Sequence, residues 1–401
     1  MPEIAEVARV VHFLRLHLVG RTITKVLAPD DANVFGKVGT SGSAFERALT
    51  GKRVVGAGTQ GKYFWLLLDS PPHPVMHLGM TGWVHVRGEQ TGYTRYVERM
   101  KGDEKEQWPP KFCRFQLQTD GDPAVEVAFT DARRFGRVRL VDCPAADIRQ
   151  RSPLVENGPD PVVDRDVFTE DFLRRKMRSR HVPVKALLLD QATISGVGNW
   201  VGDEILYQAK LHPEQYCDDF DDADVRTLYE AIRYVCDTAV EKLGDSEQFP
   251  KDWLFNHRWG KGKKDSATTL PSGEKITFIT VGGRTSCIVP SVQKKRGRAV
   301  VDIKEEEEEE TAPPDDAETK SRFFESKKGR KTEDLDSELP PKKKSRASKA
   351  IKKEEEEEEE AGIPQSNGIQ KSGKAKPEKK LKAPTPDLGR RRSNRLNKST
   401  S

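Results

Sequence analysis

The hydrophobic pattern at the start of the chain predicts an amphipathic helix over residues 2–18. Apolar side chains recur there at intervals of three and four residues, at Ile4, Val7, Val11, Leu14 and Leu18. This spacing places them on one face of a helix. A glycine follows at position 20, and glycine commonly ends a helix, so we expect a single leading helix.

The pattern then changes to short runs of β-branched, aromatic and aliphatic residues, separated by glycine, proline, aspartate and serine. The runs are TITKVL, RVVGAG, YFWLLL, VMHLGM, CRFQLQ, AVEVAF and RVRLV. Runs of this length between turn residues are typical of strands. A charge-rich stretch at residues 86–111 interrupts them and predicts a loop insertion on the surface. We therefore expect residues 1–150 to form a β-sandwich that carries the leading helix.

After the connector ENGPDPVVD the hydrophobic period becomes helical. The helical runs are VFTEDFLRRKM, VPVKALLLDQATI, VGDEILYQAKL and ADVRTLYEAIRYVCDTAVEKL, and they predict a helical domain over residues 151–245. Residues 246–295 return to strand-like runs, KITFIT and TSCIVP, with VGGR as the turn between them. Together these patterns predict an α+β multidomain fold.

The last part of the chain, residues 296–401, has no pattern that could build a core. It contains runs of six and seven glutamates, basic clusters, and only two aromatic side chains, Phe323 and Phe324. Segments this polar bury too little apolar surface to fold, so we expect a disordered charged tail. Basic clusters at 293–298, 340–346 and 389–395 are typical of nuclear import signals. They predict a nuclear location and binding to an import receptor.

Two short segments of the tail, IKEE at 303–306 and IKKE at 351–354, fit a sumoylation-like pattern. A motif of this length occurs often by chance, so its use stays open.

Composition adds few constraints. The net charge is +5 over 401 residues, so nucleic-acid binding would depend on a local basic face rather than on total charge. The five cysteines form no CxxC pair, which argues against a disulfide framework and against a four-cysteine zinc site. The N-terminus lacks a basic leader, and no apolar run approaches ~18 residues. We therefore expect a soluble protein that is neither secreted nor embedded in a membrane.

The first three residues, MPE, carry candidate chemistry. If Met1 is removed, the chain begins with the secondary amine of Pro2 beside the carboxylate of Glu3. An α-amino group titrates near ~8 and a lysine near ~10.4, so the Pro2 amine would be partly neutral and nucleophilic at pH 7. A secondary amine that attacks a sugar C1′ gives an iminium, which permits elimination of the 3′ phosphate. By itself, however, this start is far more often an ordinary N-terminus.

Five further motifs strengthen the hypothesis that Pro2 is a nucleophile. They are GKYFWLLL, HLGMTG, FTDARRFGRVRL, ISGVGNWVGDEILYQAKLHP and FITVGGRTSCIVPSVQ. Each alone has an ordinary explanation, such as a solvated lysine at a strand end, a methionine that fills a core, or a glycine-rich hairpin turn. The fourth motif is the most specific, because Gly196 and Gly198 permit a tight turn before a helix whose first amides could meet a phosphate.

Together with the start MPEIAEV, these motifs resemble the formamidopyrimidine-DNA glycosylase and endonuclease VIII family over about residues 1–293. The resemblance implies a β-sandwich, a helix-two-turn-helix domain and a β-hairpin finger. It departs at Ala5, where the family usually has a second proline, and we expect this to affect the helix start rather than the nucleophile. Bacterial members hold zinc in the finger with four cysteines, whereas only Cys287 is present here. The resemblance to plant and fungal members implies a zincless finger held by packing, with no metal or cofactor.

The resemblance also implies a role for each matching residue. Pro2 would be the nucleophile, Glu3 would assist opening of the sugar ring, and Lys62 would donate a proton and bind phosphate near the lesion. Three residues would fill the space that the extruded base leaves, namely Met80, Arg133 and Phe135. Such insertion partly replaces the stacking that base flipping loses. Three further residues would bind phosphates: Lys185, Asn199 and Arg284.

These roles imply a bifunctional DNA glycosylase and AP lyase that acts as a monomer on damaged double-stranded DNA in base excision repair. The expected substrates are oxidised purines, namely formamidopyrimidines and hydantoin products. Whether 8-oxoguanine is a substrate stays open, because the loop that contacts it in bacterial relatives does not align with EKLGDSEQFPKDWLF. Endonuclease VIII-like specificity for oxidised pyrimidines is one alternative, which the wedge residues disfavour. A damage-sensing DNA binder without catalysis is the other, and the intact Pro2, Glu3 and Lys62 argue against it.

Overall fold

The computed structural model describes residues 2–92, 107–260 and 269–295. The chain divides into two units, Met1–Glu307 and Glu308–Ser401, and every described residue belongs to the first unit. The predicted tail at 296–401, with its sumoylation-like motifs and most of its basic clusters, lies outside the described residues. Residues 93–106 of the predicted insertion lie outside them as well.

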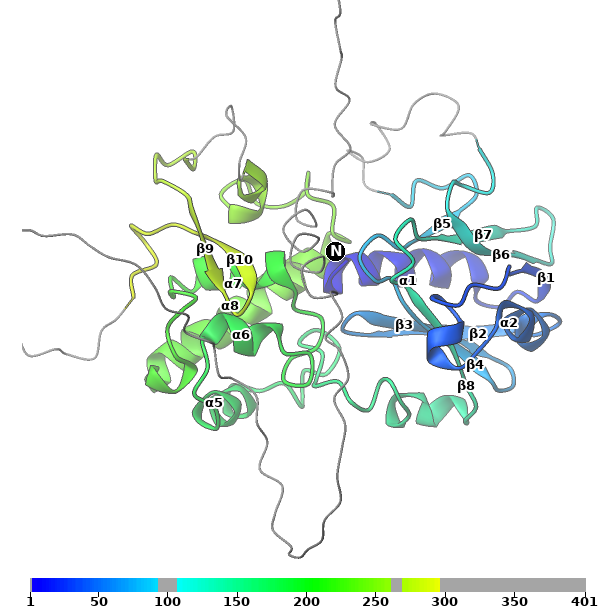
Figure 1. Cartoon of the computed structure of the whole chain (residues 1–401), viewed down its shortest axis with the longest axis horizontal. Helices are drawn as coiled ribbons and strands as arrows, with labels where there is room; N and C mark the ends of the chain where they lie inside the picture. Colours follow the sequence, from blue (N-terminus) through cyan, green and yellow to red (C-terminus); the bar gives the residue numbers. More distant parts are fainter. Residues whose placement is uncertain (1, 93–106, 261–268, 296–401) are drawn as a thin grey trace, which may run out of the picture. The chain divides into compact units, whose positions relative to one another are not determined.

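Two antiparallel four-stranded sheets build the first part of the described chain (Figure 1). One sheet has the strand order β1 (Ile23–Leu27), β6 (Cys113–Thr119), β7 (Glu126–Thr130) and β5 (Trp83–Val86). The other has the order β2 (Val54–Gln60), β3 (Tyr63–Leu68), β4 (His73–His77) and β8 (Arg137–Val141). Side chains of both sheets, among them Phe64 and Phe115, share one hydrophobic core. This arrangement is the predicted β-sandwich.

The hydrophobic runs do not predict two elements of the sandwich, helix α2 (Gly42–Leu49) and strand β5. α2 begins after Ser41, whose hydroxyl accepts the Ala44 N–H at 3.0 Å, and it buries Phe45 and Leu49. Eight residues contain too few apolar repeats to indicate a helix by periodicity. The run VMHLGM, by contrast, predicts a strand that continues past the end of β4 at His77. The strand ends there because Gly79 adopts φ 67° and turns the chain.

Four helices build the second part of the described chain. They are α5 (Glu170–Arg178), α6 (Val184–Leu189), α7 (Asn199–Gln208) and α8 (Asp222–Glu241), and their apolar faces share one core. α6 is shorter than VPVKALLLDQATI predicts, because the Asp190 carboxylate accepts the Ala192 N–H at 3.1 Å and the Thr193 hydroxyl at 2.8 Å. Such local bonds favour a turn over a further turn of helix. A glycine-containing turn then leads into α7, as the fourth motif predicts.

Short 3-10 helices complete the set of helices in the described ranges. They are η1 (Gly36–Val38), η2 (Ala145–Gln150), η3 (Cys217–Asp219), η4 (Leu254–Asn256) and η5 (Arg258–Gly260).

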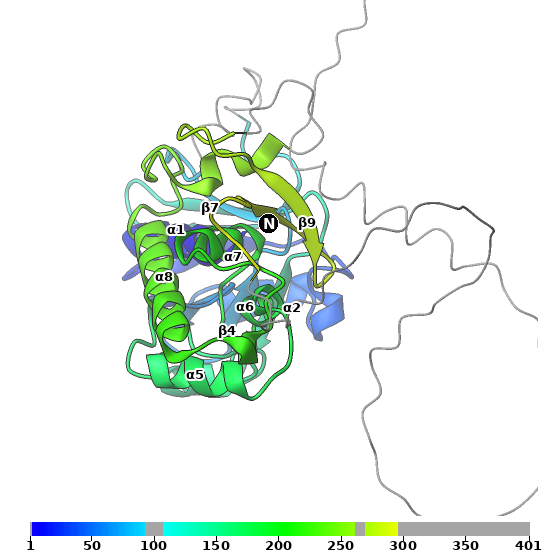
Figure 2. The same ribbon diagram turned by 90° about the vertical axis from the view of Figure 1, so that its left-hand side faces the viewer.

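The leading helix, α1 (Ile4–Leu18), belongs to two cores. Its first turn, with Ile4 and Ala5, packs in the hydrophobic cluster of the helical part, whereas Val7 to Leu18 pack in the sandwich. Figures 1 and 2 show α1 beginning beside α7 and α8, and Figure 1 shows it continuing alongside the sheets. The first residues of the chain are therefore held at the junction of the two cores.

The last described element is a β-hairpin. Strand β9 (Thr277–Val281) pairs antiparallel with β10 (Arg284–Ile288), and Gly282 and Gly283 form the turn with φ 58° and 75°. Two successive positive φ angles suit the twist of a tight hairpin and favour glycine at both positions. The hairpin packs on Leu254 of η4 through its own small apolar cluster.

The α+β fold class is confirmed by this architecture. The domain boundaries at 150, 245 and 295 stay predictions, because residues on both sides of them lie within one compact unit. Within the described ranges, no helix combines the length and the hydropathy needed to span a bilayer.

Candidate active site

The start of α1 is bound to the turn that precedes α7. The Ile4 N–H donates to the Gly196 carbonyl oxygen at 3.1 Å. Glu3 is buried, and its carboxylate accepts the backbone N–H groups of Trp200 at 3.0 Å and Val201 at 3.1 Å. These amides belong to the first turn of α7, where unpaired N–H groups and the helix dipole favour a negative charge. The residue next to Pro2 is therefore fixed in position by the helical part of the chain.

Gly198 makes this approach possible. A β-carbon at this position would lie 2.2 Å from Cδ of Glu3, closer than any nonbonded contact allows. The backbone of Gly198 is extended, with φ −124° and ψ −158°, a conformation open to any residue. Space for the Glu3 carboxylate, rather than backbone freedom, therefore requires glycine here.

Glu6 completes the binding of the N-terminal turn, and sequence reasoning assigned it no role. Its carboxylate accepts the Glu3 N–H at 2.9 Å and the Trp200 indole N–H at 3.2 Å. Burial and the charge of Glu3 raise the pKa of Glu6. The spacing Glu3-x-x-Glu6 at a helix start could have indicated this role, because a glutamate three residues after the N-cap residue often accepts the backbone N–H of that residue.

Lys62 reaches the same place from the sandwich. Gly61, with φ 58°, packs so closely on the turn before α7 that a β-carbon would lie 2.6 Å from Cβ of Ser195. The Gly61 N–H also donates to the buried Asp160 carboxylate at 2.7 Å. Lys62 is buried as well, and burial lowers its pKa. The charges of Glu3 and Glu6 partly offset this shift, and Arg284 adds to it, so all three charges act on one ammonium group.

An open pocket of about 230 Å³ lies beside Lys62. Its lining residues are Lys62, Tyr63, His77, Pro153, Glu156, Asn157 and Gln191. Burial and the charge of Lys62 lower the pKa of His77 to about 4, so its ring is neutral at pH 7. The Gly79 N–H donates to His77 Nδ1 at 3.0 Å and fixes the orientation of the ring. The lining of the pocket therefore includes a lysine ammonium and a neutral imidazole.

Asn199 connects the helical turn to the hairpin. Its side-chain Nδ2 donates to the Thr285 carbonyl oxygen at 2.9 Å, next to the predicted phosphate ligand Arg284. The buried Oδ1 of Asn199 has no hydrogen-bond partner among the described residues. The structure thus brings Glu3, Lys62, Asn199 and Arg284 together around the start of α1.

Lys185, another predicted phosphate ligand, is buried in the helical part of the chain. It is 0% exposed, its ammonium donates to the Asn199 carbonyl oxygen at 3.2 Å, and it forms an ion pair with Asp203. The second Asp203 oxygen accepts Arg258 Nη2 at 2.7 Å and the Cys287 N–H at 3.1 Å. Sequence reasoning missed Asp203, which joins α6, α7, η5 and the hairpin. The phosphate contact of Lys185 stays a prediction, and in this conformation the side chain has no surface for it.

The three predicted wedge residues lie on two loops of the sandwich that touch each other. A β-carbon on Gly79 would lie 2.4 Å from the Phe135 carbonyl carbon, so the loop with Met80 packs directly against the loop with Phe135. Phe135 is 42% exposed, and the Arg133 guanidinium lies 4.7 Å from the centre of its ring. An exposed aromatic ring paired with a cation is suited to a nucleobase surface.

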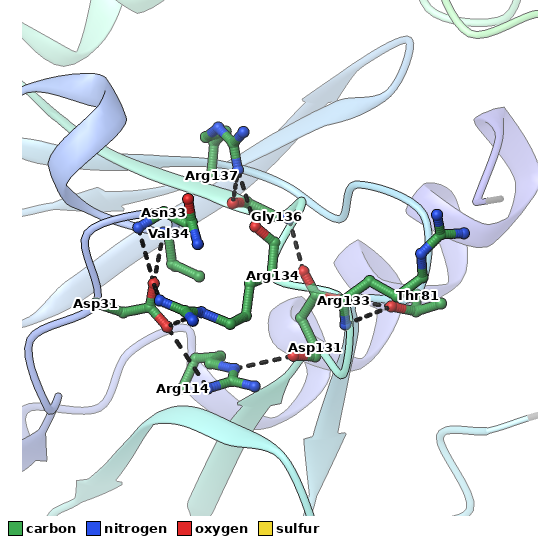
Figure 3. A network of polar contacts seen from close by, with 10 residues as sticks. All are labelled: Asp31, Asn33, Val34, Thr81, Arg114, Asp131, Arg133, Arg134, Gly136 and Arg137. Atoms are coloured by element: carbon green, nitrogen blue, oxygen red, sulfur yellow. Dashed lines mark hydrogen bonds and ion pairs between the residues drawn. The ribbon is translucent and has the colours of Figure 1, made fainter. Parts of the chain in front are cut away.

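Asp131 organises this loop, and sequence reasoning assigned it no role. Its buried carboxylate accepts the Thr81 hydroxyl at 2.6 Å, the Arg133 N–H at 3.2 Å and the Gly136 N–H at 2.6 Å (Figure 3). Arg134, which follows Arg133, adopts φ 59° and binds Asp31 through two hydrogen bonds of 2.8 and 3.0 Å. Figure 3 shows the Arg134 side chain directed to Asp31 and that of Arg133 on the other side of the loop.

The hairpin contains no arrangement that fits zinc. Cys287 is buried in the small apolar cluster, and the described ranges hold no group of three or more His, Cys, Asp or Glu side chains that could bind a metal ion. Contacts that hold the hairpin include apolar packing on Leu254 and backbone hydrogen bonds to Asn199 and Asp203. Apolar packing and hydrogen bonds thus act together on the hairpin, and a finger without zinc stays a prediction.

Comparison with known proteins agrees with the motifs. Residues 1–138 match the model of the formamidopyrimidine-DNA glycosylase N-terminal domain, and residues 157–250 match the model of the formamidopyrimidine-DNA glycosylase helix-two-turn-helix domain. Formamidopyrimidine-DNA glycosylase of Arabidopsis thaliana is 37% identical over 298 residues, which cover 74% of this chain and 72% of that protein. The protein of the same name from Pelotomaculum thermopropionicum is 30% identical over 306 residues, covering 73% of this chain and 99% of that protein.

Solved structures share the fold. Lactococcus lactis formamidopyrimidine-DNA glycosylase, bound non-covalently to DNA that contains an AP site, is similar with a TM-score of 0.57 at 24% identity, and the match covers 73% of this chain and 100% of that one. MutM in complex with DNA that contains carbocyclic 8-oxoguanine gives a TM-score of 0.57 at 23% identity, with the same coverage. The match to the Arabidopsis protein and both domain matches lead to one conclusion: the chain belongs to the formamidopyrimidine-DNA glycosylase family of DNA repair enzymes.

Proposed function

We propose that this DNA glycosylase is bifunctional: it releases oxidised purines from damaged duplex DNA and then cleaves the strand as an AP lyase. The observation that carries this proposal is the position of Glu3. Its carboxylate is held by two amides of α7 at 3.0 and 3.1 Å, directly beside Pro2 and in the field of Lys62. A nucleophilic amine, a carboxylate and a cation that converge in this way supply what the reaction requires.

The proposed chemistry begins after removal of Met1. The Pro2 nitrogen forms a bond to C1′ of the damaged nucleotide, and the bond from C1′ to the base breaks, so that the base leaves with the electron pair and takes a proton. Opening of the sugar ring, assisted by Glu3, yields an iminium. Loss of a C2′ proton then expels the 3′ phosphate, and a second elimination expels the 5′ phosphate, which leaves a gap of one nucleotide. Water finally hydrolyses the iminium, so that the sugar remnant leaves as an unsaturated aldehyde and the Pro2 amine is regenerated. We assign the proton donation near the lesion to Lys62.

The remaining residues would hold the DNA in the form that this chemistry needs. Asn199 and Arg284 lie beside each other at the junction of α7 and the hairpin, where they could bind the phosphates on either side of the extruded nucleotide. Met80, Arg133 and Phe135 would occupy the vacated stack, with Arg133 against the unpaired base. Lys185 would reach a phosphate only if its ion pair with Asp203 opened.

The first test is trapping of the iminium with borohydride on a duplex that contains a formamidopyrimidine or an abasic site. The mature protein is expected to form a stable covalent complex, because reduction fixes the bond between the Pro2 nitrogen and C1′. Protein whose N-terminus is chemically blocked is expected to form none. Trapping that is equally strong after blocking would exclude Pro2 as nucleophile, and binding without trapping or strand cleavage would identify a damage-sensing protein instead.

A second test uses the lowered pKa of Lys62. A lysine whose pKa is lowered loses its proton at a lower pH than usual, so proton donation should fail on the alkaline side before ~10.4. We expect kcat/KM for base release to fall with rising pH around a midpoint below that value, since this ratio reports groups of the free enzyme. The K62Q variant should be slow and should lack this decline. An identical alkaline decline in K62Q would assign it to another group.

Further features stay proposals of ours. We propose formamidopyrimidines and hydantoin products as the substrates, and a panel of lesion duplexes that includes 8-oxoguanine would rank them. We also propose that the enzyme acts as a monomer without a metal cofactor, and that the basic clusters of the tail bind an import receptor and direct it to the nucleus.

A further inference from the structure

Phe112 has an unusual backbone conformation for a bulky residue. It lies immediately before β6 with φ 63°, in the left-handed region that residues with a β-carbon rarely adopt. Its side chain is 49% exposed. An aromatic residue here costs conformational free energy and returns little by burial, since about half of the residue stays exposed. Strained residues of this kind concentrate at functional sites.

The strained residue is held against the wedge loop. The Asp131 N–H donates to the Phe112 carbonyl oxygen at 3.0 Å, and Arg114 Nε donates to the Asp131 carbonyl oxygen at 2.9 Å. Asp131 is the residue whose carboxylate holds the backbone of Arg133 (Figure 3). The backbone of Phe112 therefore lies one hydrogen bond from the residue that positions the wedge.

Two pairs of a cation and an aromatic ring lie in the segments that are hydrogen-bonded to Asp131. In the first pair, the Arg133 guanidinium lies 4.7 Å from the ring centre of Phe135. In the second pair, the Lys111 ammonium lies 5.2 Å from the ring centre of Phe112. Lys111 and both rings are exposed. Paired in this way, a ring can stack on a base while the cation meets a phosphate.

We propose that Phe112 and Lys111 form a second aromatic contact with the damaged duplex, next to the wedge of Met80, Arg133 and Phe135. The Phe112 ring stacks on a nucleobase beside the vacated position, and Lys111 neutralises a neighbouring phosphate. This contact rests on the proposed function, because it requires damaged duplex DNA as the ligand. It adds two residues that none of the family motifs assigns.

Equilibrium binding of the full chain to a duplex that contains a tetrahydrofuran abasic analogue tests the contact. F112A is expected to bind about tenfold more weakly than wild type, the loss that removal of one stacked ring usually causes. F112G should lose as much, although glycine relieves the backbone strain, whereas F112W should retain wild-type affinity. K111A should lower the salt dependence of binding by about one phosphate. The control L16A removes an exposed apolar side chain from α1 and should change nothing.

A fluorescent base, 2-aminopurine, placed in turn at each position beside the abasic analogue identifies the stacked nucleotide. We expect one position to be quenched by wild type and by F112W, and to brighten with F112A. Unchanged affinity of F112A, in protein that traps normally with borohydride, would overturn the contact and leave the proposed function intact. Full affinity of F112G would overturn it as well, because the ring would then be unnecessary. Failure of wild type to trap would overturn the proposed function instead.

Discussion

Replacement of Gly198 by alanine is expected to lower the single-turnover rate of base release about 100-fold and to leave the chain folded. The added β-carbon would lie 2.2 Å from Cδ of Glu3. Because Cδ is near the end of a flexible side chain, the carboxylate can move while the backbone stays. It then loses the N–H groups of Trp200 and Val201, and with them its position beside Pro2. Borohydride trapping and base release on one lesion duplex would measure the effect.

Gly202, in the helix α7 that follows Gly198, provides a matched control. A β-carbon there would lie 3.4 Å from the nearest heavy atom, Cε of Lys185, an ordinary contact, so G202A should remain active. In addition, G198A and E3Q should be slow to a similar extent, and the double variant should be no slower, because both changes remove the same carboxylate from the same position. Multiplied losses in the double variant, or full activity of G198A, would show that Glu3 need not occupy this position.

Replacement of Asp203 by alanine is expected to lower the free energy of unfolding by about 3–5 kcal/mol, the usual cost of removing one partner from a buried ion pair. The reason is burial: Lys185 is 0% exposed and would be left in the core without its carboxylate partner. Arg258 and the Cys287 N–H would lose the same acceptor. Urea unfolding followed by circular dichroism would measure the change.

Two control variants test whether the cost of D203A comes from the burial of this ion pair and from the central position of Asp203 in it. D171A removes a carboxylate that also forms an ion pair with an arginine, but its side chain is 73% exposed, so the cost should stay below about 1 kcal/mol. K185M leaves Asp203 paired with Arg258 and should therefore cost less than D203A. If K185M proved the more destabilising of the two, Asp203 would not be the centre of this network.

Much of the fold could be predicted from the sequence, because its signals are local. The run YFWLLL coincides with β3, and the apolar spacing of the first 18 residues coincides with α1. The sequence patterns did not predict the short elements or the ends of some elements. Helix α2 contains only eight residues, and α6 ends early because the Asp190 side chain bonds to nearby backbone and hydroxyl groups. The spacing of apolar residues does not reveal side-chain hydrogen bonds that compete with those of a helix.

The candidate site could be predicted only as a set of residues. Motifs named Glu3, Lys62, Asn199 and Arg284, and the structure brings them together. The sequence could not show that the partner amides of Glu3 lie 197 and 198 positions away. Nor could it distinguish a lysine at the surface from the buried Lys185. Asp203 could have indicated that Lys185 is buried, since a carboxylate between the buried Val201 and Ile205 of an apolar helix needs a buried cation.

The membership of α1 in two cores has a consequence for cooperativity. Loss of the helical core would release the first turn of α1, and loss of the sandwich core would release the rest. The sandwich and the helical part are therefore thermodynamically coupled and are expected to melt in one transition rather than in two. A fragment that ended between them would lack either the amides that bind Glu3 or the strand that carries Lys62. Folding and assembly of the catalytic group thus become a single event.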